Sequence, residues 1–129
     1  MRHLITLLVV IAALLTGCAG GTQQQQSQPQ SLKFDTTVQG RTYSVEAQPL
    51  DSADGYSYTI SINGHRYIHQ TIIPVVQGLH HFETVEDALN TGKVVIAKMM
   101  HSNDLPSLTT GDLIMLGILS KDSTLNKRK

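Results

Sequence analysis

A strict alternation of apolar and polar residues that runs into an Asn-Gly pair constrains this fold more than any other feature. Residues 56–62, Tyr-Ser-Tyr-Thr-Ile-Ser-Ile, alternate with a period of two, as a strand with one buried face does. Asn63-Gly64 follows, and both residues tolerate the positive φ angles that a two-residue type I′ turn requires. Residues 65–72 are therefore predicted to return as the second strand of an antiparallel hairpin.

The two-residue turn also predicts which residues face one another across this hairpin, because it sets the register of the strands. The predicted pairs are Ile62–His65, Ile60–Tyr67 and Tyr58–His69. One face of the hairpin would then carry Tyr58, Ile60, Ile62, Tyr67 and His69, and the other Ser57, Thr59, Ser61, Arg66, Ile68 and Gln70.

Two further strands are predicted ahead of this hairpin. Residues 33–38 and 41–48 flank a turn at Gln39-Gly40, and the second of these segments alternates apolar with polar side chains. Pro49 and the polar residues 51–55 end that strand and form a loop.

The C-terminal half reads as helical. Thr84 is a predicted N-cap for a helix over residues 85–101, whose apolar stripe includes Gly92 and so allows a close approach to the sheet. Thr109 predicts a second N-cap, with a short helix over 112–116 and Gly117 as its left-handed C-cap. The polar residues 120–129 are expected to form a frayed tail.

These elements predict an α+β domain over residues 33–119. It would hold a small antiparallel sheet of three to four strands, with one main helix and one short C-terminal helix packed on one face. A connector, residues 71–83, joins the last strand to the main helix. It is unusually apolar for a loop, so we expect it to be partly packed against the domain.

The N-terminus has the pattern of a targeting segment. Residues 1–17 combine a basic start with a short apolar stretch, as a signal peptide does, and Leu15-Thr16-Gly17-Cys18 resembles the lipobox of bacterial lipoproteins. We expect Cys18 to be lipidated and to anchor the mature chain to a membrane. Residues 18–32, rich in Gln and without large apolar runs, are expected to form a disordered tether.

Composition excludes several classes of protein. The chain has 129 residues with ten Lys or Arg and ten Asp or Glu, so it lacks the basic footprint of a nucleic-acid-binding protein. A single Cys rules out an intramolecular disulfide framework.

The segment from Gly55 to Leu119 resembles a family of small uncharacterised bacterial lipoproteins that carry a domain of unknown function. The resemblance implies an envelope location in Gram-negative cells and assigns no activity, ligand or catalytic residue. It rests on Gly55-Tyr56, Asn63-Gly64, Tyr67-Ile68-His69-Gln70, Ile73-Pro74, Gly78, Phe82, Asp87-Ala88 and Leu116-Gly117-Ile118.

Residues that carry chemistry are sparse. His65 and His69 lie about 13 Å apart on one strand, so the pair does not hold one metal ion by itself, and neither His80-His81 nor His101 is predicted to converge with them. Nucleophile-elbow and zinc-protease motifs are absent from the sequence, so we expect no enzyme activity, no metal site and no cofactor. For His69 and Gln70 we favour a structural role, in which the imidazole and amide bond the backbone of the connector.

The leading hypothesis is therefore a non-enzymatic envelope lipoprotein. It would be anchored through Cys18, most simply to the outer membrane facing the periplasm, because no acidic run follows the Cys. It would bind another envelope protein through an exposed sheet edge or the connector. The alternative is a module for a small ligand or glycan, with a binding site built from Tyr67, His69, Gln70, Pro74 and Phe82.

Overall fold

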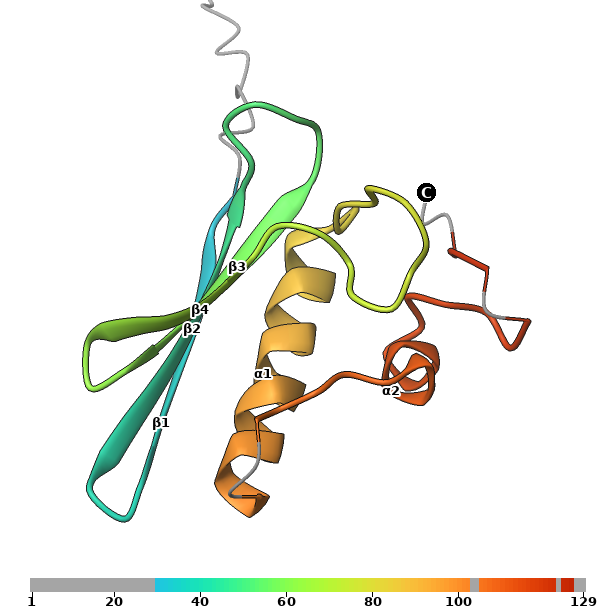
Figure 1. Ribbon diagram of the computed structural model, residues 1–129. Helices are drawn as coiled ribbons and strands as arrows, with labels where there is room; N and C mark the ends of the chain where they lie inside the picture. Colours follow the sequence, from blue (N-terminus) through green and yellow to red (C-terminus); the bar gives the residue numbers. More distant parts are fainter. Residues whose placement is uncertain (1–29, 103–104, 123, 127–129) are drawn as a thin grey trace, which may run out of the picture.

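The computed structural model describes residues 30–102, 105–122 and 124–126, whose arrangement is shown in Figure 1. Four strands come first: β1 (Leu32–Val38), β2 (Arg41–Pro49), β3 (Tyr56–Ile62) and β4 (His65–Gln70). Two helices follow, α1 (Val85–His101) and α2 (Thr110–Met115). Helix α1 packs against one face of the antiparallel sheet and α2 lies beyond it on the same side, so the expected α+β fold is confirmed.

The predicted signal peptide, the lipidation site Cys18 and nearly all of the predicted tether lie outside the described residues, as do the basic residues 127–129. These predictions concern the localisation and the membrane attachment of the chain. The described residues begin just before β1.

The sheet is a simple antiparallel meander in the order β1-β2-β3-β4. Both predicted two-residue turns are present. Gln39 and Gly40 have φ angles of 51° and 75°, and Asn63 and Gly64 have φ angles of 49° and 81°. Positive φ at both central residues is what a type I′ turn requires, so these turns follow from local sequence alone.

The predicted register of the β3–β4 hairpin is wrong beyond the turn. Ile62 pairs with His65 as expected, but a β-bulge lies between Ile60 and Ser61. Tyr67 is the extra residue of the bulge, and the pairs beyond it are Ile60–Ile68, Thr59–His69 and Tyr58–Gln70. The bulge places Ile68 on the face covered by α1 and His69 on the open face. Ile68 takes the position opposite Ile60 that was predicted for Tyr67, so an aliphatic side chain packs against the core at the cost of a continuous ladder.

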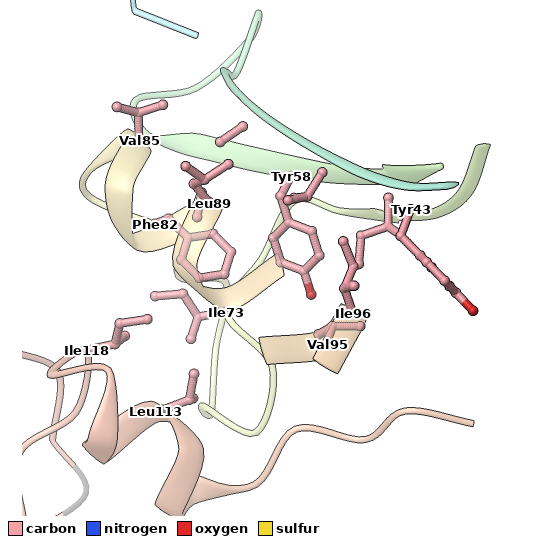
Figure 2. Close-up of a cluster of buried hydrophobic side chains, with 14 of the residues drawn as sticks. Tyr43, Tyr58, Ile73, Phe82, Val85, Leu89, Val95, Ile96, Leu113 and Ile118 are labelled. Atoms are coloured by element: carbon pink, nitrogen blue, oxygen red, sulfur yellow. The ribbon is translucent and has the colours of Figure 1, made fainter. Parts of the chain in front are cut away.

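Helix α1 begins and ends where the sequence predicts. The Thr84 hydroxyl accepts a hydrogen bond from the Asp87 N–H at 3.1 Å, which caps the helix. Its apolar stripe forms most of the core together with β2 and β3, as Figure 2 shows. The fully buried members of this core include Tyr58, Ile60, Phe82, Ile96 and Leu113.

Helix α2 begins two residues earlier than predicted, at Thr110, because Thr109 and Asp112 form a complete capping box. Asp112 also accepts a hydrogen bond from the Lys98 ammonium at 2.7 Å, which ties α2 to α1. After the helix Gly117 adopts a φ of 70°, as predicted for a left-handed C-cap. The Ile118 N–H then donates to the Leu113 carbonyl at 2.9 Å and completes a Schellman motif.

The expected frayed tail is contradicted for the described residues between 120 and 126. Leu119 and Leu125 form an antiparallel bridge, and the Asn126 N–H donates to the Ile118 carbonyl at 2.9 Å. The side chain of Leu125 packs against the core. One apolar residue in an otherwise polar segment is enough to fold the chain back over the end of the domain.

Candidate functional site

The connector, residues 71–83, leaves the sheet at the end of β4 and returns to it just before α1. Gln70, the last residue of β4, pairs with Tyr58 of β3. Near the other end of the connector, the Tyr56 N–H donates to the Phe82 carbonyl at 2.9 Å. Phe82 therefore continues the edge of β3 where β4 has ended, and the two ends of the connector lie close together (Figure 1). This is the arrangement of an Ω-loop, a compact loop type that is frequently functional.

Three hydrogen bonds close the base of the connector. The Ile73 N–H donates to the His80 carbonyl at 2.7 Å, and the Gln70 side-chain amide donates to the Ile72 carbonyl at 2.8 Å. His81 Nδ1 lies 2.6 Å from the Thr71 carbonyl oxygen, which can only accept, so Nδ1 carries the proton. The base of the loop is therefore held by its own backbone and by two polar side chains.

Apolar side chains anchor the same base in the core. Ile73 and Phe82 are buried, and both side chains point into the cluster between sheet and helices in Figure 2. The rings of Phe82 and Tyr58 lie 5.8 Å apart between centroids and are tilted by 58°. Burial raises the pKa of the Tyr58 phenol to about 12, so this hydroxyl stays neutral beneath the loop. The expectation that the connector is partly packed is confirmed.

The tip of the connector has the opposite character. Val75 is 58% exposed and Leu79 is 82% exposed, although both side chains are apolar. Val75 also has a φ of 57°, in the left-handed region that β-branched residues rarely adopt. Such a conformation costs of order 1–3 kcal/mol and persists only where the surrounding structure imposes it. The connector thus holds two exposed aliphatic side chains at its tip, above a base that hydrogen bonds and buried side chains fix, and its backbone is strained at Val75.

The space around the connector is small or shallow. Beneath it lies a cavity of about 60 Å³, enclosed by the connector, the start of α1 and the C-terminal segment; its lining includes His81, Asp87, Ile118 and Leu125. This volume suits a few water molecules. Outside the connector, beside Leu79, an open depression of about 300 Å³ is lined by Asp54, His80 and Glu83 among others. The site therefore presents a protruding apolar surface with a polar margin.

The five residues predicted to line a ligand site are not brought together. The bulge places Tyr67 in a groove of about 250 Å³ with Arg41, Tyr43 and Met99, at the end of the sheet away from the connector. His69 lies on the open face of the sheet, where its Nδ1 is 2.8 Å from the Thr59 hydroxyl. Gln70 ends β4, Pro74 lies in the connector, and Phe82 is fully buried in the core.

The predicted structural role is confirmed for Gln70 and is wrong for His69. Gln70 bonds the connector backbone, as expected, but the imidazole that does so is His81. Its recruitment depends on the antiparallel contact between Thr71 and His81, which no local pattern indicates. The exposed residues Val75 and Leu79 could have been singled out, because aliphatic side chains in a loop are unusual.

The described ranges contain no group of three or more His, Cys, Asp or Glu side chains that could hold a metal ion. His69 of the hairpin contacts the Thr59 hydroxyl on the open face of the sheet, whereas His81 bonds the backbone at the base of the connector. Within the same ranges, the two helices are too short or too polar to cross a membrane.

Comparison with known proteins places this architecture in a family. A family model described as "Domain of unknown function (DUF4907)" matches residues 48–114. The chain belongs to the DUF4907 family. No curated protein and no solved structure matches it.

The DUF4907 match runs from the end of β2 to α2, so it contains the hairpin, the connector and the main helix. Strand β1, most of β2 and the C-terminal segment that returns over the core lie outside it. The family description assigns no activity, so any function of the DUF4907 domain has to be argued from geometry.

Proposed function

We propose that this protein is an envelope lipoprotein whose DUF4907 domain is a non-enzymatic protein-interaction module. In this proposal Cys18 is acylated and anchors the chain to the outer membrane, facing the periplasm. Residues 18–32 tether the folded domain to the membrane surface. The connector binds an apolar pocket of another envelope protein through Leu79 and Val75.

The observation that carries the proposal is the exposure of Leu79 on a loop whose base is anchored in the domain. An isolated exposed leucine is ordinary. Here, however, the side chain is 82% exposed on a loop that is closed by hydrogen bonds, anchored by Ile73 and Phe82, and strained at Val75. A side chain held in this way loses little conformational freedom on binding, so more of its burial energy is available for affinity.

The polar side chains at the base of the connector have a structural role, and this supports a binding function, rather than a catalytic one, for the loop. Gln70 and His81 direct their side-chain donors at backbone carbonyls of the connector. Groups engaged in this way orient the loop, whereas a catalytic acid or base would face a substrate-sized space. The Asp54, His80 and Glu83 margin of the depression beside Leu79 suits the polar rim of a protein interface.

The lipid anchor is supported by sequence alone. The apolar stretch from Leu4 to Leu15 is shorter than the roughly 20 residues that a transmembrane helix needs. Cys18 is the only cysteine and follows that stretch at the spacing of a lipoprotein cleavage site. Two or three acyl chains on one residue would hold the chain at the membrane, because each buried methylene contributes about 0.8 kcal/mol.

A photocrosslinking amino acid placed at position 79 tests the interaction in cells. Position 105 is the matched control, since Leu105 is 83% exposed and lies outside the connector. We expect position 79, and not position 105, to give an adduct with one envelope protein. Mass spectrometry would identify that protein, and purified partner should bind the wild-type chain.

The anchor is tested in the same cells with a Cys18→Ala variant, which should leave the membrane fraction and lose the adduct. The same adducts from positions 79 and 105, or adducts from neither, would refute the connector as the binding surface. Retention of the Cys18→Ala variant in the membrane fraction would refute the lipid anchor and leave the interaction to be judged by the crosslink alone.

A further inference from the structure

The outer edge of β1 is regular, and no other strand of the described residues pairs with it. β1 and β4 form the two edges of the sheet, and β4 is interrupted by the bulge at Tyr67. β1 pairs with β2 along all seven of its residues without a register shift. Within the described part of the chain, no strand lies beyond β1. An edge of this kind is a template for another strand, because its outward N–H and C=O groups have no partner in the sheet.

The turn at Gln39-Gly40 determines which residues of β1 point their backbone groups outward. In a two-residue hairpin the residues that flank the turn, here Val38 and Arg41, form a hydrogen-bonded pair. Hydrogen-bonded pairs then alternate along the ladder, so the even-numbered residues of β1 bond to β2. The odd-numbered residues Lys33, Asp35 and Thr37 direct their N–H and C=O groups to the free edge.

This alternation restricts how a second copy could pair with β1. In a symmetric antiparallel pair, outward-facing residues must oppose outward-facing residues, so the two-fold axis passes through a residue of β1. An axis at Lys33 or Asp35 would place two like charges directly opposite each other. An axis at Phe34 gives two equivalent pairs of opposite charge, because Lys33 of each copy then faces Asp35 of the other.

The charges and the apolar surface of β1 both favour the axis at Phe34. Lys33 and Asp35 lie on the open face with their charged groups 3.5 Å apart, and both side chains are more than half exposed. Phe34 lies on the helix side and is 38% exposed, with the Lys93 ammonium 4.9 Å from its ring centroid. Pairing at this axis would bring the two Phe34 side chains together at a non-hydrogen-bonded position, where opposed side chains are closest.

We propose that two copies of this chain associate through β1, antiparallel and centred on Phe34. The two four-stranded sheets then form one continuous sheet, with α1 of each copy on the same side. In the dimer, the contact between Lys33 and Asp35 of one strand is replaced by contacts between Lys33 of each copy and Asp35 of the other. The connector lies beside β3, away from β1, so both connectors of the dimer stay accessible (Figure 1).

A cysteine at the axis reports this register directly. In a non-hydrogen-bonded pair the Cα atoms lie about 4.5 Å apart, within the range that a disulfide bridges. The full-length chain with Phe34→Cys, oxidised in cells with copper phenanthroline, is expected to give a disulfide-linked dimer. Thr36→Cys is the register control, because Thr36 would oppose Leu32. The wild-type chain controls for Cys18, its only cysteine.

Charge reversal tests the same register without changing Phe34. The detergent-solubilised full-length chain is expected to sediment as a dimer. The Lys33→Asp variant is expected to be monomeric, because the new carboxylate at position 33 of each copy would face the Asp35 carboxylate of the other. The double variant Lys33→Asp/Asp35→Lys should restore the dimer. Resistance to protease would show that each variant is folded.

A monomeric wild-type chain would overturn the proposal. Equal crosslinking from positions 34 and 36 would also overturn the assigned register, as would a double charge reversal that stays monomeric. Each of these results is independent of the connector and of the lipid anchor, so they bear on the β1 pairing alone.

Discussion

A methyl group built on Gly92 of α1 would lie 2.3 Å from Cγ2 of Val45 and 3.3 Å from Cδ2 of Tyr58. The helix backbone therefore lies tightly against the sheet at Gly92. Alanine at a mid-helix position is ordinarily favoured over glycine by about 1 kcal/mol. Here the overlap involves a stiff, fully buried β-branched side chain, and overpacking of this kind costs about 1–3 kcal/mol. We expect Gly92→Ala to lower the free energy of unfolding, as measured by urea denaturation.

The double variant Gly92→Ala/Val45→Ala separates this overlap from a general effect on the helix. Removing the Val45 methyl groups makes room for the new one, so the double variant should be less destabilised than the sum of the single variants. Strict additivity of the two changes would contradict the close contact.

Gly55, in the loop after β2, lies against the end of the connector at His81 and Phe82. It has a φ of 121°, and an added Cβ would lie 2.9 Å from the Phe82 carbonyl oxygen and 2.7 Å from His81 Cβ. Because one of these atoms belongs to the backbone, it has little freedom to move. We expect Gly55→Ala to lower the free energy of unfolding by about 3 kcal/mol or more, from strain and overlap together.

Gly40→Ala is the matched control for that variant. Gly40 also has a positive φ, of 75°, but no atom lies within 4 Å of its added Cβ. Gly40→Ala should therefore lower the free energy of unfolding only through the left-handed backbone conformation, by roughly 1–2 kcal/mol. Thermal denaturation that ranks the two variants equally would argue against the tight junction at Gly55.

The contact between Lys98 and Asp112 makes the attachment of α2 depend on pH. The hydrogen bond from the Lys98 ammonium, with those from Thr109, holds the pKa of the Asp112 carboxyl below its ordinary value of 3.8. A lowered pKa in the folded state contributes stability above the ordinary pKa, and this contribution is lost as the pH falls through the folded-state value. We expect Asp112→Asn to lower the free energy of unfolding at neutral pH by about 1 kcal/mol.

The difference between wild type and Asp112→Asn should shrink as the pH is lowered from about 5 to about 2, because the wild-type carboxyl then becomes neutral as well. Urea denaturation across this range measures both proteins under the same conditions. A difference that stays constant at acid pH would show that the charge of Asp112 does not stabilise the fold.

The strain at Val75 predicts a conflict between stability and binding. Asparagine tolerates the left-handed region better than a β-branched residue, so Val75→Asn should raise the free energy of unfolding by about 1 kcal/mol. The same change removes one of the two exposed aliphatic side chains, so we expect it to weaken the crosslink from position 79. Thermal denaturation and the crosslinking yield measure the two effects.

Val76→Asn is the control for this variant, because Val76 packs partly against the core and is not among the residues with positive φ. It should lower the melting temperature. If Val75→Asn also lowered it, the φ of Val75 would not be a source of strain in the folded protein.

Much of the fold was predictable because its signals are local. The Asn63-Gly64 turn, the Thr84 and Thr109 caps and the Gly117 C-cap each depend on the residues next to them, and each is present. The close approach at Gly92 also followed from one residue on an apolar stripe. The candidate site was less predictable, because its residues come together through contacts between distant segments.

The bulge at Tyr67 shows why a local rule failed. A two-residue turn determines only the pairs that flank it, and the bulge gives Ile68, rather than Tyr67, the position opposite Ile60 and against the core. The same register change moved His69 to the open face and Gln70 to the covered face, the reverse of the predicted arrangement. The bulge removed Tyr67 and His69 from the predicted five-residue ligand site, and burial in the core removed Phe82 from it.

The sequence by itself determined the order and approximate bounds of the strands and helices, the two tight turns, the helix caps and the α+β class, because short-range geometry and hydrophobic periodicity decide these features. The tertiary structure decided which side chains share a surface. It brought Phe82 back to the edge of β3, gave His81 the bond to Thr71 and left Leu79 exposed. Such contacts depend on the competition of distant segments for one buried core, and no spacing along the chain encodes that competition.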